Sequence, residues 1–333
     1  MGLVQYIGRR LVTYVLVLFI GISITFFLPR FMPNDPIEGY IAQMQSQAGQ
    51  TLSPEAVDQL RESLSDLYGL KGSLFSQYVG YLERVFLRFD FGPSFGAFPR
   101  PVSDLIFIAL PWTIGLLVTT TLVSWTLGNL IGIVAGYFHN KRAATALEVF
   151  GILLYPIPYY ILALTLILLL AYTWPIFPLS TTIRPGTLSF NQLGMILYNS
   201  ALPALTLVLA GFGWNILSMK SLAFATKEEP YVTFARLKGT TDWTRMTSYV
   251  FRNAMLPQIT ALVLSLGTIF NGALLTEMLF SYPGLGLLMR TAVGTADYNL
   301  LYGTITMSII AVATAGLVLD LVYPLFDPRI RYR

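Results

Sequence analysis

The chain has 333 residues, of which 55% are hydrophobic and 11% charged, with a formal net charge of +4. Soluble domains carry roughly a quarter of their residues as charged side chains, so a chain this apolar cannot cover soluble domains with polar groups. The absence of cysteine excludes disulfides, thiolate zinc sites and cysteine nucleophiles, and the single histidine, His139, excludes an HExxH metal helix.

Long uncharged stretches dominate the chain, and a helix that crosses a bilayer needs about 20 mostly apolar residues. We therefore expect an all-α, polytopic membrane protein with six transmembrane helices. The expected spans lie near residues 11–29, 113–138, 147–173, 201–220, 258–279 and 299–323. The expected organisation is an N-terminal segment with the first helix (1–29), an outer cap (30–104) and a membrane core (105–333).

The first span follows Arg9 and Arg10. It is too long for the apolar region of a typical signal peptide, and no small-x-small cleavage site follows it, so we interpret it as a retained signal anchor. In the cap, Ser53 and Pro54 predict a helix start, and Gly69 is expected to close that helix. A second amphipathic stretch covers residues 78–89.

The middle spans contain polar residues that are candidates for a translocation path, namely Asn129, Asn215 and Asn271. Ordinary helix–helix contacts are the alternative, because small and polar residues also pack membrane helices together. The pairs Pro111–Trp112 and Trp174–Pro175 are expected at interfacial helix ends, where indole rings lie at headgroup level.

The segment 221–257 connects the fourth and fifth spans. Glu228, Glu229 and Pro230 predict a helix start, the bases Arg236 and Lys238 suit its last turn, and Gly239 suits a left-handed C-terminal residue. Thr241 or Asp242 can then cap a second helix, and Pro257 marks the entry to the next span. Such a helix suits docking in a groove of a partner; an amphipathic connector on the lipid surface is the alternative.

Four charged residues lie near the ends of outer segments: Asp90, Glu277, Arg290 and Asp297. They are candidates for a substrate mouth or for contact with a binding protein, and the alternative is solvated loop charges or a local ion pair. With six spans, 13 of the 21 basic residues but only six of the 17 acidic ones fall on the side of the termini. The positive-inside rule then places both termini in the cytoplasm.

The loop also carries a family resemblance. Glu229, Ala235 and Gly239, followed by Leu256–Pro257, resemble the EAA loop of ABC importer permeases. Further co-linear stretches resemble the B-type permeases of the dipeptide/oligopeptide (Dpp/Opp) family over essentially the whole chain, among them residues 31–36, 90–94, 101–104, 276–286 and 320–331. Phe89 departs from the pattern, since that family usually has glycine there.

The resemblance implies a type I ABC importer permease in the inner membrane of a bacterium or archaeon. It implies a C-type permease partner, two ATPase subunits that bind ATP and magnesium, and an extracytoplasmic binding protein. It assigns the coupling to the ATPases to Glu229, Ala235, Arg236, Lys238, Gly239, Thr241, Asp242 and Pro257. The dipeptide Gly-Lys never occurs, so this chain has no phosphate-binding P-loop and is not expected to be an enzyme or to hold a cofactor.

The cargo stays open at this point, and two other classes of protein are less consistent with the sequence. The same machinery carries oligopeptides, oligosaccharides or nickel chelates in look-alike systems. A secondary transporter would need ionisable groups in the middle of its spans, and none is present in the predicted ones. Nucleic-acid binding lacks a clustered basic groove, because the basic residues follow the topology of the membrane.

Overall fold

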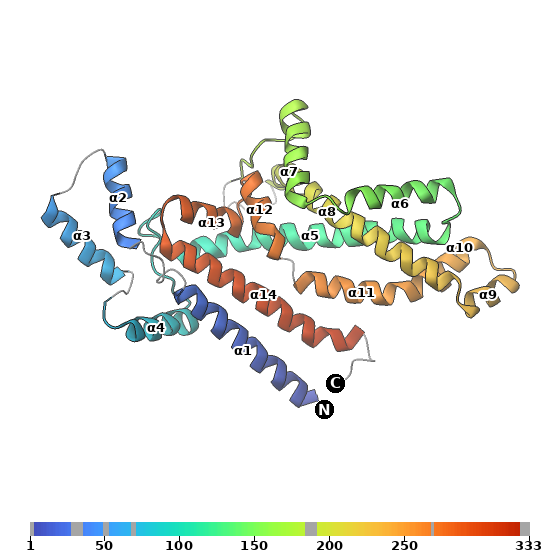
Figure 1. Cartoon of the computed structure of the whole chain (residues 1–333), viewed down its shortest axis with the longest axis horizontal. Coiled ribbons are helices and arrows are strands. Elements are labelled where there is room, and N and C mark those ends of the chain that lie inside the picture. Colours follow the sequence, from blue (N-terminus) through green and yellow to red (C-terminus); the bar gives the residue numbers. More distant parts are fainter. Residues whose placement is uncertain are drawn as a thin grey trace.

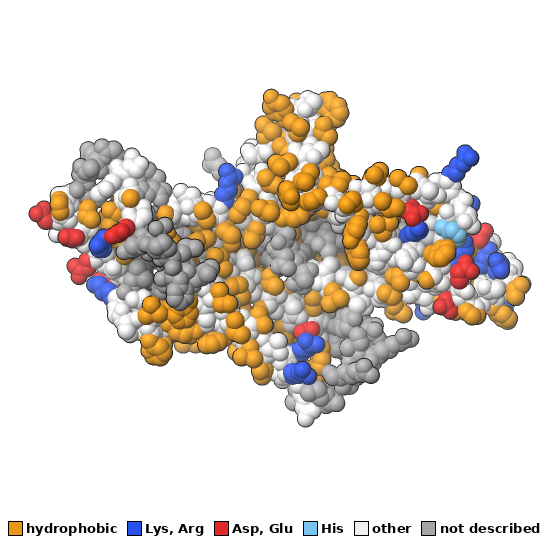
Figure 2. Space-filling model, viewed as in Figure 1, with side chains coloured by type: hydrophobic (Ala, Val, Ile, Leu, Met, Phe, Trp, Pro, Cys, Tyr) orange, Lys and Arg blue, Asp and Glu red, His pale blue; other side chains and the backbone are white. Residues whose placement is uncertain are grey.

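The computed structural model describes residues 3–27, 36–48, 53–67, 71–183, 192–267 and 270–326. Within them the chain is helical, apart from turns and one isolated β-bridge between Pro93 and Pro101, as the all-α prediction requires. The molecule is elongated, with α2 and α3 at one end and α9 at the other (Figure 1). Charged side chains gather mainly at these two ends, and hydrophobic side chains cover much of the middle (Figure 2).

Four helices are long and apolar enough to cross a membrane: α1 (Leu3–Phe27), α5 (Val102–Tyr137), α8 (Leu193–Lys227) and α14 (Tyr298–Phe326). A fifth span is formed if α6 (Arg142–Leu154) and the pair α7 (Tyr159–Ile167) and η3 (Leu168–Thr173) are counted together. The axis of α6 and the axis of the α7–η3 helix differ by 98°. Pro156 and Pro158 lie at the break, and proline interrupts helical hydrogen bonding.

The predicted second span begins earlier than expected. Its helix, α5, starts at Val102 and contains Pro111 in its interior. Trp112 is only 3% exposed and packs edge-to-face against Tyr282, with ring centroids 6.0 Å apart. The prediction that Trp112 lies at an interfacial helix end is therefore wrong: its ring is buried among protein side chains. Trp174, by contrast, is 59% exposed.

The predicted fifth span is divided in the structure. It corresponds to α11 (Arg252–Gly267) and α12 (Phe270–Phe280), and residues 268–269 between them are outside the described part. Pro257 lies inside α11 and not at its entry. A short helix, α13 (Leu285–Gly294), follows before α14.

The central packing contact joins α5 and α8. Three glycines spaced four residues apart, Gly128, Gly132 and Gly136, line the α5 side of this contact. A Cβ atom at Gly132 would lie 2.7 Å from the carbonyl oxygen of Ile216 and 2.7 Å from the Cβ of Met219. Small residues at this spacing let two membrane helices approach closely, so α5 and α8 form a tightly packed pair.

The cap contains α2 (Pro36–Ala48), α3 (Pro54–Leu67), α4 (Leu74–Glu83) and the π-helical segment η2 (Arg84–Arg88). The predicted helix start at Ser53 and Pro54 is confirmed, and the hydroxyl of Ser53 accepts a hydrogen bond from the Ala56 N–H at 3.3 Å. Its predicted end at Gly69 lies outside the described residues, as do the resembling segments 31–35 and 327–331.

Candidate functional site

The connection between α8 and α11 folds into a short helix, α9 (Pro230–Leu237), then α10 (Asp242–Thr244) and the π-helical segment η5 (Arg245–Phe251). Glu229 has an extended backbone before α9, and Pro230 occupies the first helical turn, where its missing N–H has no intrahelical acceptor. The helix, its proline start and its glycine end confirm the prediction made for this segment.

The end of α9 is fixed by local hydrogen bonds. Gly239 has φ of 77°, in the left-handed region where a side chain is strained. The Thr240 hydroxyl donates to the carbonyl oxygen of Ala235 at 2.8 Å. Thr241, rather than Asp242, caps α10, since its hydroxyl accepts a hydrogen bond from the Thr244 N–H at 3.3 Å.

Two faces of α9 have different surroundings. Val232 and Ala235 are 4% and 3% exposed, and Val232 belongs to an apolar cluster that also includes side chains of α5, α8 and η5. On the other face Phe234 is 60% exposed and Leu237 is 78% exposed. An open groove of about 430 Å³ lies beside them, and its lining residues are Pro230, Tyr231, Phe234, Ala235, Lys238 and Tyr249. The helix is thus held by one apolar face and presents another.

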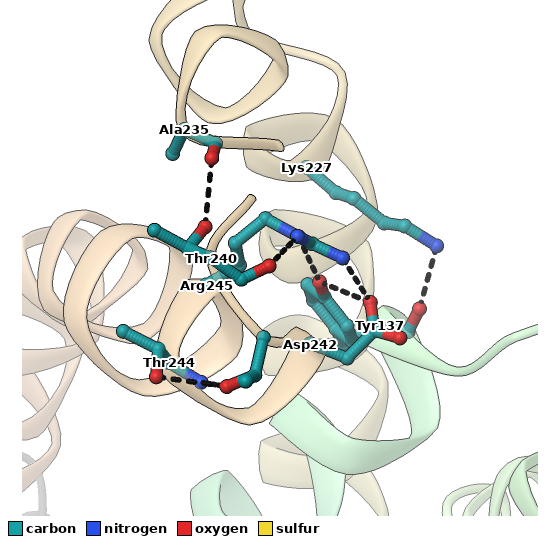
Figure 3. Close-up of polar contacts among 8 residues, drawn as sticks. Tyr137, Lys227, Ala235, Thr240, Asp242, Thr244 and Arg245 are labelled. Carbon is teal, nitrogen blue, oxygen red and sulfur yellow. Dashed lines mark hydrogen bonds and ion pairs between the residues drawn. The ribbon is translucent and has the colours of Figure 1, made fainter. Parts of the chain in front are cut away.

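A polar cluster joins the end of α9 to the end of α5 (Figure 3). The Tyr137 hydroxyl donates to Oδ1 of Asp242 at 3.0 Å, and it accepts from Nε of Arg245 at 3.3 Å. Arg245 also donates to Oδ1 of Asp242 at 2.7 Å and to the carbonyl oxygen of Thr240. Lys227, the last residue of α8, donates to the Tyr137 carbonyl oxygen at 2.7 Å. We call Tyr137, Lys227, Thr240, Asp242 and Arg245 the α5–α9 joint.

The charges of the joint stabilise one another. The hydrogen bond from Arg245, followed by that from Tyr137, lowers the pKa of Asp242 below its ordinary value of 3.8. The hydrogen bond that Arg245 donates to Tyr137, followed by the one that it donates to Asp242, raises the pKa of Arg245. Asp242 is therefore ionised and Arg245 protonated at neutral pH, and the ion pair persists across the physiological range. Sequence reasoning placed Asp242 in this loop but missed Tyr137, Lys227 and Arg245.

The other predicted residues of the loop have exposed side chains outside the α5–α9 joint. Arg236 and Lys238 are exposed, and the ammonium group of Lys238 lies 5.1 Å from the centre of the Phe234 ring. Glu229 is exposed at the start of α9. Lys238 lines the groove, and none of the three side chains belongs to the joint, so the predicted residues of the loop divide between an exposed surface and the joint.

The asparagines of the membrane helices lie in helix contacts. Asn129 is 1% exposed and its amide donates to the Trp125 carbonyl oxygen at 2.7 Å within α5. Asn215 donates to Oγ of Ser124 at 3.3 Å, which links α8 to α5. Asn215 thus contributes to the contact between α5 and α8, and a part of either residue in a translocation path stays a prediction. The side chain of Asn271 lies outside the described part.

Two carboxylates predicted near the outer mouth are buried. Glu277 is 0% exposed and accepts from the Gly286 N–H at 2.6 Å. Asp297 is also 0% exposed. Neither is a solvated loop charge, so that alternative is wrong for both, and in this conformation neither carboxylate is available to a docking protein.

Asp297 is the centre of a dense set of hydrogen bonds. Its Oδ2 accepts from the Ser94 hydroxyl at 2.6 Å and from the N–H groups of Phe95 and Gly96 at 2.8 and 3.1 Å. Its Oδ1 accepts from the Leu300 N–H at 3.0 Å. The residue therefore fixes the loop that precedes α5 to the start of α14, a structural function for a residue considered earlier as a surface contact.

Asp90 and Arg290 remain at the surface. Oδ1 of Asp90 accepts from the Gly92 N–H at 2.8 Å, which makes a local turn. Arg290, in α13, donates to the Met278 carbonyl oxygen at 3.2 Å. Both side chains are exposed, so they remain accessible to a partner. Among the described residues, no group of three or more His, Asp or Glu side chains is arranged to hold a metal ion.

Two parts of the chain match known protein families. Residues 128–332 match the family described as the binding-protein-dependent transport system inner membrane component, and residues 3–117 match the N-terminal part of such membrane components. The two matches together include α1, the cap helices, both ends of α5 and the whole loop that carries α9.

Individual relatives are similar over nearly their full length. A Sinorhizobium fredii protein (y4tP), named as a peptide ABC transporter permease, is 30% identical over 329 residues, which are 98% of this chain and 99% of the relative. The inner membrane ABC transporter permease protein YejB of Escherichia coli O157:H7 is 27% identical, with 98% of each chain covered. A Brucella abortus protein, named as a peptide transport system permease, is 28% identical over 97% of this chain and 98% of its own length.

Proposed function

The chain belongs to the family of inner membrane components of binding-protein-dependent transport systems, and from this premise we propose that it imports peptides and is coupled to its ATPase through α9. It is a permease subunit of an ABC importer, located in the inner membrane. Beyond this family membership, we propose the cargo, the partner that α9 contacts, and the route by which the ATPase moves the membrane helices.

The coupling proposal depends on α9 having one buried apolar face and one exposed apolar face. An isolated surface helix would bury one apolar face and leave the other polar, whereas α9 leaves Phe234 and Leu237 exposed beside an open groove. Apolar anchors next to a groove are typical of helix-in-groove recognition. Because the α5–α9 joint attaches this helix to α5, a push on α9 reaches the membrane helices as a rigid-body movement.

The partners follow from the family. An importer of this type needs an energy source, and the chain has no Gly-Lys dipeptide to build a P-loop. We propose that two ATPase subunits bind ATP and magnesium, that a second, C-type permease completes the membrane channel, and that an extracytoplasmic binding protein delivers the cargo. ATP binding shifts the permease between inward-open and outward-open states through contacts that differ between the two.

The membrane topology is also a proposal. Six spans result if the bent segment of α6, α7 and η3 crosses once and α11 with α12 crosses once, in addition to the four long helices. The concentration of basic residues beside Arg10, Lys141 and the α9 loop supports a cytoplasmic location for both termini and for α9.

The docking proposal is tested by a charge on the exposed face of α9. Leu237→Glu keeps the buried face of the helix intact and places a carboxylate where an apolar anchor is proposed. Central anchors of protein interfaces are worth about 2 kcal/mol or more, so we expect roughly 30-fold weaker association with the ATPase subunits in co-purification. Ser248→Glu, at an exposed position of η5, is the matched control. Equal ATPase recovery from both variants would contradict docking through α9.

The cargo is tested with the complete transporter in proteoliposomes. The relatives named as peptide permeases support peptides, so labelled oligopeptides delivered by the cognate binding protein should accumulate inside in the presence of ATP. Mass spectrometry of the ligands retained by that binding protein gives an independent answer. Retention of oligosaccharides or nickel chelates, without peptide uptake, would overturn the assignment of the cargo and leave the docking proposal intact.

A further inference from the structure

The segment formed by α4 and η2 packs against the end of α1 that is farther from the N-terminus. The Tyr78 hydroxyl lies 2.6 Å from Oγ of Ser23, and the Tyr78 ring lies 5.2 Å from that of Phe26. The Tyr81 hydroxyl lies 3.1 Å from Oγ1 of Thr306 in α14. Since the apolar span of α1 ends at Phe27, these contacts place the segment at the level of the membrane boundary.

The opposite side of this segment is also apolar. Phe75, Val79 and Phe86 recur at helical spacing and are 75%, 47% and 44% exposed, and Leu87 is 78% exposed. The buried side carries Val85, which is 1% exposed. A helix that is apolar on two sides has no face suited to water, and exposed apolar patches of this kind mark a contact with a protein or a membrane.

The neighbouring surface decides between these two contacts. The exposed side chains of α1 near this end are Phe19, Ile20 and Ile24, at 46%, 54% and 57% exposure. They belong to a membrane span, so the apolar surface of α4 and η2 continues a surface that meets lipid. Figure 2 shows hydrophobic side chains along this edge, over α4 and α1.

The exposed charged residues of the α4–η2 segment differ from those of α3 in the same cap. The exposed side of α3 carries Glu55, Asp58 and Glu62, as expected for a helix in water. The α4–η2 segment instead carries one acidic residue, Glu83, which is paired with Arg88 at 2.8 Å, and Lys71 before the segment is paired with Asp66 at 2.6 Å. Because these charges are paired, this segment costs less free energy to place against lipid than the acidic surface of α3 would.

We propose that α4 and η2 form an interfacial helix, with the Phe75, Val79 and Phe86 stripe inserted among the lipids where the α1 span ends. The partner of this surface is the bilayer itself. The cap is then attached to the membrane by its own α4–η2 segment, while α2 and α3 remain in the aqueous phase. This attachment sets the height at which the cap stands above the membrane and does not depend on the identity of the cargo.

The absence of cysteine allows a direct test with spin labels in the complete transporter, reconstituted in nanodiscs with partner subunits made cysteine-free. Val79→Cys and Phe86→Cys report on the stripe. Ile24→Cys in α1 is the lipid reference, and Glu62→Cys in α3 is the aqueous reference. Each label is measured by electron paramagnetic resonance for its accessibility to oxygen, which concentrates in lipid, and to a water-soluble nickel chelate.

We expect the labels at residues 79 and 86 to have a high ratio of oxygen to nickel accessibility, close to that at residue 24 and opposite to that at residue 62. The ratio should not change when the binding protein is added. A ratio like that at residue 62 would overturn the proposal in favour of a water-exposed surface. Low accessibility to both reagents, or a decrease on adding the binding protein, would overturn it in favour of a protein partner. Labelling yield and transport by each variant establish that the chain is folded.

Discussion

The α5–α9 joint makes a quantitative prediction about coupling. Tyr137→Phe removes one hydroxyl, and with it the bond to Asp242 and the bond from Arg245, while the ring remains in its apolar cluster. Hydrogen bonds to charged groups contribute about 1.5–3 kcal/mol each. Because the Asp242 side chain is 64% exposed, screening by solvent reduces the expected loss to about 1–2 kcal/mol for the pair.

This loss falls on the connection between the loop and α5 rather than on the docking surface. We therefore expect ATPase subunits to assemble normally, while the number of ATP molecules hydrolysed per peptide imported rises. A loss of about 1–2 kcal/mol corresponds to roughly a 5- to 30-fold change in the balance between attached and detached states of the joint. The assay is simultaneous measurement of ATP hydrolysis and peptide uptake in proteoliposomes.

Two further variants make the result interpretable. Tyr160→Phe removes a hydroxyl from an exposed residue of α7 and should leave the ratio of hydrolysis to uptake unchanged. In a double-mutant cycle, the effects of Tyr137→Phe and Arg245→Met should sum to less than their separate values, because both changes break the bond between Arg245 and Tyr137. An unaltered ratio in Tyr137→Phe, or additive effects of the two changes, would refute the argument that this hydroxyl transmits the movement of α9.

Three other variants have defined outcomes. Gly132→Leu should lower the thermal stability of the purified complex by about 1–3 kcal/mol through overpacking of α5 against α8, whereas Gly115→Leu, at a position with no atom within 4 Å of the added Cβ, should not; equal melting temperatures would contradict the close contact. Because Arg245 and Tyr137 lower the pKa of Asp242, the stability that the Asp242 carboxylate contributes is fully present above its ordinary pKa of 3.8 and is lost as the pH falls through the folded-state value. The difference in melting temperature between the natural chain and Asp242→Asn should therefore be constant near neutral pH and disappear only in acid, and a loss between pH 6 and 8 would argue against the ion pair. Asp297→Ala should increase hydrogen exchange at Phe95 and Gly96, because both N–H groups lose their acceptor; unchanged protection at those two amides would show that the loop is held by other contacts.

The sequence predicted best those features that depend on local chemistry. The start of α9 at Pro230 and its end at Gly239 follow from the missing N–H of proline and the left-handed backbone of glycine. The first and last spans follow from their uncharged length. In both cases the physical cause lies within a few residues of the feature, so a single sequence carries the information.

Features that depend on tertiary neighbours were predicted poorly. Trp112 has the sequence context of an interfacial residue but is buried, because Tyr282, distant in the chain, packs on its ring. Glu277 and Asp297 look like loop charges in the sequence, because most of the groups that stabilise their carboxylates are backbone N–H groups. Every residue type except proline supplies such a group, so the sequence does not mark it. Arg245 was not among the predicted site residues, because its partner Tyr137 is on another helix and far from it in the sequence.

One departure from the family pattern has a local explanation. The resemblance to Dpp/Opp permeases leads us to expect glycine at the position of Phe89, and in the structure Phe89 has φ of 53°. That backbone region favours glycine, so the backbone of Phe89 is strained in a conformation that glycine adopts without strain. Its ring lies 5.8 Å from the ring of Phe91 and 6.2 Å from that of Phe107, and these aromatic contacts offset part of the cost of this strain.

The position of α5 connects the two ends of the molecule. Its residue Tyr137 belongs to the joint with α9, and its residue Thr113 accepts a hydrogen bond from the Leu285 N–H at 2.9 Å, at the start of α13. At 1.5 Å per residue these two contacts are about 36 Å apart along one helix. Because the close contact at Gly132 holds α5 against α8, we expect a displacement of α9 to move both helices together. The turn before α13 is joined to the far part of α5 by this hydrogen bond. The hydrogen bond from Leu285 to Thr113 is therefore where we expect a movement that begins at the ATPase to reach the opposite face of the membrane.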